Sequence, residues 1–126
     1  ALGFGQTIVS LTWDQLAQDI EAEKVWGLYI IDRDAAKVWG ARSSALLKKC
    51  EVVVWQSPWK GRTGELAHFR LPATAYVEEE GHFTNFQGVT QRYEQALEPL
   101  GLARPDWRIF EGLRARLEGR AAPRAR

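Results

Sequence analysis

The sequence predicts an α/β protein with a small, mainly parallel sheet. Two apolar runs, 25–31 and 52–55, are rich in β-branched and aromatic side chains, which is typical of strands covered on both faces. A third, shorter run at 69–71 ends at Pro72. Segments with helical spacing precede these runs. Such alternation favours parallel strands joined by right-handed crossovers, as in part of a three-layer, Rossmann-like domain.

The length and composition are those of one ordinary globular domain. The chain has 126 residues, of which 45% are hydrophobic and 26% are charged, and its formal net charge is +1. These values exclude disordered, collagen-like and polycationic nucleic-acid-binding proteins. No run approaches the roughly eighteen apolar residues that a membrane-spanning helix needs, so we expect no membrane insertion. Because the chain begins at Ala1 and contains no methionine, we expect it to be a piece of a longer polypeptide.

Residues 1–72 are expected to form the parallel-sheet core. Thr12 and Gln15 have the spacing of a capping box, and apolar residues at helical spacing follow them, which predicts a helix over 13–22. Two further helices are predicted in this segment, over 43–49 and 63–67.

The rest of the chain is expected to be less regular but to belong to the same domain. Residues 73–104 are predicted to be loop-rich, with a polar turn at 78–81, a loop or irregular hairpin at 82–88 and a short helix at 90–97. Residues 105–126 are predicted to be a C-terminal helix and a basic, solvated tail. The apolar residues of that helix share one face: Ile109, Phe110, Leu113 and Leu117.

The carboxyl ends of the predicted strands are where a doubly wound sheet binds ligands. The loop after the second strand, 56–64, combines glycines, two cations and an aromatic ring directly before a helix, a composition that suits an anion. An ordinary polar loop in which Trp59 packs on the domain explains the same composition. The candidate binding residues of this loop are Ser57, Lys60, Arg62 and Thr63.

The turn after the first strand has the opposite character. Asp32 and Asp34 stand where a phosphate-binding turn would have glycines, and with no His or Cys beside them we interpret the pair as a solvated turn. One cysteine and two histidines, Cys50, His68 and His82, cannot supply a cysteine-rich metal site, and none forms a triad pattern. We therefore predict no catalytic residue and no metal site, and expect a buried, reduced thiol at Cys50.

The chain contains six tryptophans, which is many for its length. Three lie on core-facing patterns and are expected to be buried: Trp13, Trp26 and Trp55. The other three are less clearly internal, and exposed together they would suggest a docking surface: Trp39, Trp59 and Trp107.

The stretch from Glu65 to Phe110 contains an ordered string of uncommon short motifs. They are Glu65-Leu66-Ala67, Leu71-Pro72-Ala73, Glu78 with Gly81, Phe83-Thr84-Asn85, Gly88, Gln91, Glu98-Pro99, Gly101 and 103–107, Ala-Arg-Pro-Asp-Trp. This string resembles the molybdopterin oxidoreductase family, and most closely the C-terminal part of the large iron–sulfur subunits of NADH-quinone oxidoreductase (respiratory complex I). The upstream runs at 24–31 and 49–54 look like the strand units that precede the string in that family.

The resemblance implies a structural role. In family members that hold a molybdenum–pterin cofactor, this region belongs to the α/β domains around it. In the complex I subunits it implies a structural relic, with iron–sulfur clusters elsewhere in the parent subunit. The motif positions expected to be structural are Pro72, Glu78, Gly81, Asn85, Gly88, Pro105 and Asp106.

Several positions depart from the family pattern: His68, Arg70, His82, Gln87 and Val89. The family usually has Arg where this chain has Val89, so a cation that can pair with phosphate is missing. Asp32 and Asp34 would likewise repel the phosphates of a pterin dinucleotide. These departures favour the relic.

Our main expectation is therefore a structural and docking segment of a respiratory complex, without its own catalytic centre and without a cofactor in this segment. Its partners would be the rest of the parent large subunit and the other subunits, at the cytoplasmic, inner face of the plasma membrane, and not nucleic acid. One alternative is a fragment of a true molybdenum–pterin oxidoreductase in which 56–64, Thr84 and Asn85 face the cofactor. The other is an independent protein-binding module that uses exposed tryptophans or the basic tail.

Overall fold

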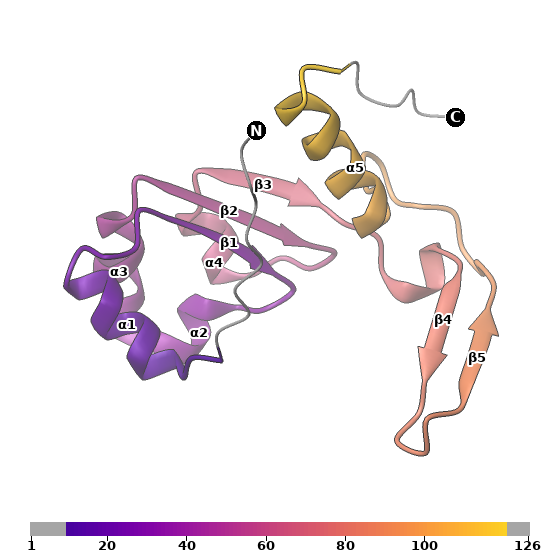
Figure 1. The fold of residues 1–126 in the computed structure, drawn as a ribbon, viewed down its shortest axis with the longest axis horizontal. Coiled ribbons are helices and arrows are strands. Elements are labelled where there is room, and N and C mark those ends of the chain that lie inside the picture. Colours follow the sequence, from indigo (N-terminus) through magenta and orange to yellow (C-terminus); the bar gives the residue numbers. More distant parts are fainter. Residues whose placement is uncertain (1–9, 121–126) are drawn as a thin grey trace.

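A computed structural model describes residues 10–120 of the protein (Figure 1). A sheet of three parallel strands, in the order β1-β2-β3, is built from β1 (Gly27–Ile31), β2 (Val52–Ser57) and β3 (Phe69–Pro72). The helices are α1 (Trp13–Glu21), α2 (Ala35–Trp39), α3 (Ser43–Lys49), α4 (Arg62–Leu66) and α5 (Asp106–Leu117), with short 3-10 turns at Gly40–Arg42 and Tyr76–Glu78. Helices α1 to α4 lie on one face of the sheet and α5 lies on the other, so the predicted three-layer α/β arrangement is confirmed.

The core lies between the sheet and α1 to α4. Ile30, Val53 and Trp55 point from the strands into this layer, and each is less than a tenth exposed. The capping box forms as predicted, because the Gln15 amide donates to the Thr12 hydroxyl and the Thr12 amide donates to the Gln15 side chain. The helices contribute further buried apolar side chains, among them Ala17, Ile20, Leu46 and Leu47, and the free thiol of Cys50, directly after α3, is buried with them.

The second face of the sheet is only partly covered. Tyr29 and Ile31 are each about two-fifths exposed there, and Phe69 on the edge strand is 59% exposed. The Tyr29 ring lies 5.9 Å from the ring of Phe110, centre to centre, so α5 covers part of this face. Among the described residues no helix is long and apolar enough to cross a membrane.

A β-hairpin replaces the predicted helix at 90–97, and that prediction is wrong. Strands β4 (Gly81–Thr84) and β5 (Thr90–Tyr93) pair antiparallel, and the rings of Phe83 and Tyr93 stack 4.6 Å apart. The Asn85 side chain accepts hydrogen bonds from the amides of Gln87 and Val89, which closes the turn between the strands. This cross-strand pairing decides the conformation, and it is not visible in local helical spacing.

The tryptophans are distributed differently from the prediction. Trp39 is 8% exposed, because α2, a short helix that the sequence pattern did not indicate, carries it into the core. Its indole donates to the Trp13 carbonyl, and the two rings meet edge to face at 5.5 Å. Trp55 is buried as predicted, but Trp26 precedes β1 and is 70% exposed, and Trp13 at the start of α1 is 37% exposed. The prediction of burial is therefore wrong for Trp26, whose apolar run begins outside the paired part of the strand, and for Trp13, whose ring only partly packs against Trp39.

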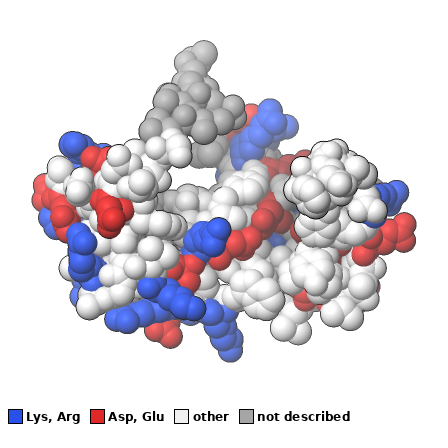
Figure 2. Space-filling model, turned by 90° about the horizontal axis from the view of Figure 1, so that it is seen from below, with Lys and Arg blue, Asp and Glu red and all other residues white. Residues whose placement is uncertain are grey.

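The two signs of charge are interspersed over the face of the molecule that Figure 2 shows. This agrees with the formal net charge of +1.

Candidate functional site

The carboxyl edge of the sheet is held together by Asp34. Its carboxylate accepts four hydrogen bonds: from the hydroxyl of Thr63 at 2.6 Å, from the amide of Thr63 at 3.1 Å, and from the amides of Lys37 and Arg62 at 3.2 Å each. One carboxylate therefore caps α2 and also fixes the loop that follows β2. This loop and the turn that follows β1 are the two places where a doubly wound sheet binds ligands.

Thr63 is the buried partner in this arrangement. Its side chain is fully buried at the start of α4, and its hydroxyl accepts a hydrogen bond of 2.8 Å from the Ala36 amide while it donates to Asp34. Burial of the Asp34 carboxyl opposes its ionisation, but the hydrogen bonds that it accepts outweigh this effect, so the pKa of Asp34 lies below the ordinary value of 3.8. Asp34 is therefore a structural anion and not the solvated turn residue that the sequence predicts.

The other predicted residues of the loop divide into two kinds. Ser57 is 6% exposed, and its hydroxyl accepts a hydrogen bond from the Trp59 amide at 3.2 Å. Lys60 and Arg62 have exposed side chains at the surface of the loop. Ser57 and Thr63 thus use their hydroxyls within the fold, and only the two cations remain open to a ligand.

Acidic groups surround the end of β1. Burial raises the pKa of Asp32 above its usual value, and the negative charge of Asp106 at the start of α5 raises it further. Between residues 10 and 120, no group of three or more His, Cys, Asp or Glu side chains is placed to hold a metal ion. The edge therefore combines three carboxylates with exposed cations from both loops, among them Arg33, Lys60 and Arg62.

The anionic phosphates of a pterin dinucleotide do not fit this edge. Backbone N–H groups at the start of a helix are the usual ligands of such phosphates, but here the amides of Arg62 and Thr63 already donate to Asp34. A Cβ at Gly61 would lie 2.9 Å from an Asp34 carboxylate oxygen and 3.2 Å from the Trp55 ring. Because Gly61 has no side chain, the Asp34 carboxylate can lie close to the backbone there, in the space that a phosphate would need.

Thr84 and Asn85 lie elsewhere. They are at the far end of the β4–β5 hairpin, which extends away from the sheet in Figure 1. The Thr84 hydroxyl lies 2.9 Å from that of Thr90, and Asn85 closes the turn. The structure does not bring this pair together with Ser57, Lys60, Arg62 and Thr63 into one site.

Several motif positions make contacts that hold the loop-rich segment. Glu78 accepts hydrogen bonds from the amides of Ala75 at 2.8 Å and Leu100 at 3.1 Å. Gly88 adopts a φ of 81°, which the hairpin turn requires. Gly81 lies against the ring of Tyr93, Pro72 pairs with the end of β2, and Pro105 directly precedes α5.

Gln56 is predicted from the sequence to begin the loop 56–64 and is not among the candidate binding residues, but it lies within β2. It is fully buried on the second face of the sheet, where it accepts a hydrogen bond from the Tyr29 hydroxyl and donates one of 2.6 Å to Asp106. This chain of contacts joins β1, β2 and the first turn of α5. The feature of the sequence that points to this role is a single polar residue directly after the apolar run 52–55.

Comparisons with known proteins agree with this architecture. The sequence model of the family Molybdopterin oxidoreductase matches residues 7–116. The NADPH-Fe(3+) oxidoreductase subunit alpha of Geobacter sulfurreducens is 34% identical over 107 residues, which are 83% of this chain and 13% of that protein. A Staphylococcus aureus protein named as a formate dehydrogenase is 34% identical over 105 residues, 82% of this chain and 11% of that protein.

Among solved structures, acetylene hydratase from Pelobacter acetylenicus superposes with a TM-score of 0.68 at 21% identity, over 84% of this chain and 16% of that chain. This likeness shows the shared fold. The chain spans only a small part of the length of these relatives. Since the family's sequence model and two relatives at 34% identity each cover most of it, the chain belongs to the molybdopterin oxidoreductase family.

Proposed function

We propose that this chain is part of the large subunit of a molybdenum–pterin oxidoreductase, in which it forms a structural lobe beside the cofactor. The family match over residues 7–116 carries this proposal. The relatives are named as oxidoreductases or dehydrogenases, and this chain corresponds to 13% and 11% of two of them. The reaction would therefore belong to the longer polypeptide.

The bound cofactor would supply the oxidation–reduction chemistry of the parent enzyme. The residues of this chain would support it indirectly, because Asp34 already occupies the amides that a phosphate would use. Asp34 fixes the loop between β2 and α4, and Gln56 holds α5 on the sheet. In this proposal the chain shapes the protein around the cofactor, and other parts of the parent bind the cofactor's phosphates.

A second candidate is the C-terminal segment of the large iron–sulfur subunit of an NADH-quinone oxidoreductase. The closed carboxyl edge of the sheet favours it, since a lobe that has lost its cofactor needs no open phosphate site. Docking to the other subunits of a respiratory complex, at the cytoplasmic face of the plasma membrane, belongs to this candidate.

The metal and pterin content of the parent polypeptide separates the two. We would purify the whole polypeptide that contains this segment and measure molybdenum, iron and oxidised pterin per chain. The first proposal predicts molybdenum together with pterin, and predicts that growth on tungstate removes molybdenum but leaves pterin in place. Iron–sulfur clusters without pterin would reject it and support the second candidate.

A further inference from the structure

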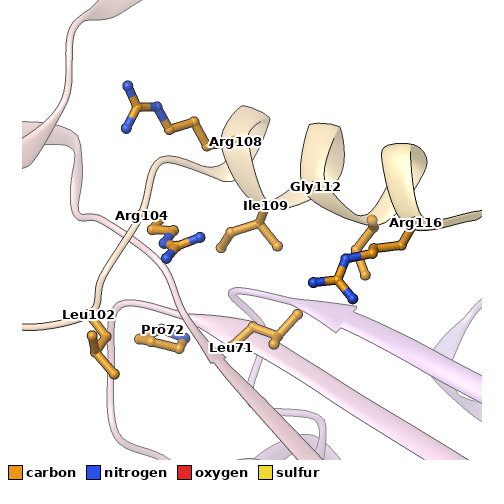
Figure 3. Close-up of a pocket in the computed structure, with 9 residues that line it drawn as sticks. Leu71, Pro72, Leu102, Arg104, Arg108, Ile109, Gly112 and Arg116 are labelled. Carbon is orange, nitrogen blue, oxygen red and sulfur yellow. The ribbon is translucent and has the colours of Figure 1, made fainter. Parts of the chain in front are cut away.

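An open groove of about 420 Å³ lies between α5 and the end of β3 (Figure 3). Its apolar surface is formed by Leu71 on β3, Leu102 on the segment before α5, and Ile109 and Leu113 on α5. Leu102 is 81% exposed and Leu113 is 39% exposed. A small molecule in so open a groove would keep much of its surface in water, whereas a polypeptide segment can cover the whole groove.

The groove is basic as well as apolar. Figure 3 shows the guanidinium groups of Arg104 and Arg116 directed into it, at separate places along its length. No ion pair joins either group to a carboxylate of residues 10–120, whereas Arg114 on the same helix pairs with Glu118 at 2.9 Å. Charge complementarity therefore calls for an occupant that carries carboxylates beside apolar side chains.

The chain itself does not offer such an occupant at its ends. Residues 1–9 and 121–126 contain no Asp or Glu. A second copy that docked through the same groove would place arginine against arginine, which is unfavourable in a two-fold interface. The relatives, by contrast, are many times longer than this chain, which covers 13% and 11% of two of them.

We propose that the groove binds an acidic, apolar segment of the parent polypeptide, from outside these 126 residues. An apolar side chain of that segment fills the space over Leu71 and Ile109, and two carboxylates pair with Arg104 and Arg116. The inference rests on the proposed function only in that this chain is part of a longer polypeptide. It does not depend on whether the parent holds molybdenum.

Photo-cross-linking in the full-length parent tests the docking. We would place a benzophenone amino acid at Leu113, irradiate the purified protein and identify the linked peptide by mass spectrometry. The expected result is one cross-link to a peptide of the same polypeptide that contains at least two Asp or Glu residues. A cross-link to a second copy, to another subunit or within these 126 residues would overturn the proposal, as would the absence of a defined cross-link.

Charge reversal gives the matched control. The double variant Arg104→Glu/Arg116→Glu is expected to lower the cross-link yield at least about tenfold, since two charge-assisted pairs are lost. Arg114→Glu makes the same kind of charge change on α5 outside the groove and should leave the yield unchanged. An equal yield in the double variant would contradict the role of the arginines.

A steric variant covers the case in which the double variant does not fold. Gly112 lines the groove, and a Cβ built there meets no atom within 4 Å. Gly112→Leu fills the groove without changing its charge, and we expect it to abolish the cross-link while the parent stays folded. Retention of the cross-link in Gly112→Leu would reject the groove as the docking site. Molybdenum content, measured on the same samples, reports on the proposed function separately.

Discussion

Gln56 and Asp106, fifty residues apart in the chain, are joined by a hydrogen bond of 2.6 Å from the Gln56 side-chain amide to the Asp106 carboxylate. Gln56 is fully buried on β2, and Asp106 lies in the first turn of α5. The hydroxyl of Tyr29 donates to the other end of the same amide. A polar residue inside the sheet thus specifies where the C-terminal helix packs.

Removing the acceptor at this contact should destabilise the protein. Asp106→Ala leaves the buried Gln56 amide without its partner, and we expect the free energy of unfolding to fall by about 1–3 kcal/mol. Asp106→Asn keeps an oxygen acceptor and should cost less than half of that. Urea denaturation of the two variants checks this, and equal stabilities would show that the hydrogen bond does not hold α5.

Asp34 is expected to matter more than Asp32, although both acids belong to the same turn. Asp34→Asn retains one carbonyl oxygen but places an NH₂ group where amides donate, so we expect a loss of about 1–3 kcal/mol in stability. Asp32→Asn, which tolerates the φ of 57° at that position, should be neutral or slightly stabilising, because it removes a desolvated charge beside Asp106. Thermal unfolding of both variants makes the comparison, and a larger loss in Asp32→Asn would contradict the assignment.

The contribution of Asp34 should depend on pH in one direction. Its pKa in the folded protein lies below the ordinary 3.8, so its ionised form stabilises the fold above that pH, and this stabilisation is lost as the pH falls through the lower, folded value. The stability difference between wild type and Asp34→Asn should therefore be largest near neutral pH and shrink below about pH 4. Denaturation midpoints of both proteins, measured from pH 7 down to pH 3, test this. A stability difference that grows on acidification would contradict the predicted direction.

Two glycine-to-alanine changes should act in opposite directions. A Cβ at Gly64 would collide with the ring of Trp55, so Gly64→Ala should destabilise by about 1–3 kcal/mol through overpacking. Gly112 lies inside α5 with open space around it, so Gly112→Ala should stabilise by about 1 kcal/mol through helix propensity. Circular dichroism melts of the two variants make the comparison, and a tolerated Gly64→Ala would show that α4 is not packed on Trp55.

The parts of the fold that could be predicted are those with local signals. The capping box at Thr12 and Gln15 predicts α1, and the two apolar runs predict the parallel strands. Helix α2 has only five residues, too few for a helical period to show, and its cap is the Asp34 that looked like a free turn residue. Strand β5 owes its conformation to pairing across the Asn85 turn, so its own residues did not reveal it.

The candidate site was harder to predict for the same reason. The sequence pattern predicts that Asp34 and Thr63 lie at the ends of neighbouring strands. It assigns Asp34 to a solvated acidic turn and Thr63 to an anion-binding loop, and so predicts no contact between them. The two residues are twenty-nine positions apart in the chain, and the hydrogen bond from the Thr63 hydroxyl to the Asp34 carboxylate gives both side chains a partner. Only the folded chain shows that the carboxylate takes the place that an anion would occupy.

The central claim is that Asp34 closes the carboxyl edge of the sheet to phosphate. Its most direct test is an NMR titration of the chain with inorganic pyrophosphate at constant ionic strength, observing the amides of Arg62 and Thr63. Because both amides already donate to Asp34, we predict no saturable shift of either signal in the wild-type protein. Saturable shifts centred on Arg62 and Thr63 would show that phosphate displaces the carboxylate. The carboxyl edge would then be an open anion site, which would contradict the claim that Asp34 keeps phosphate away from it.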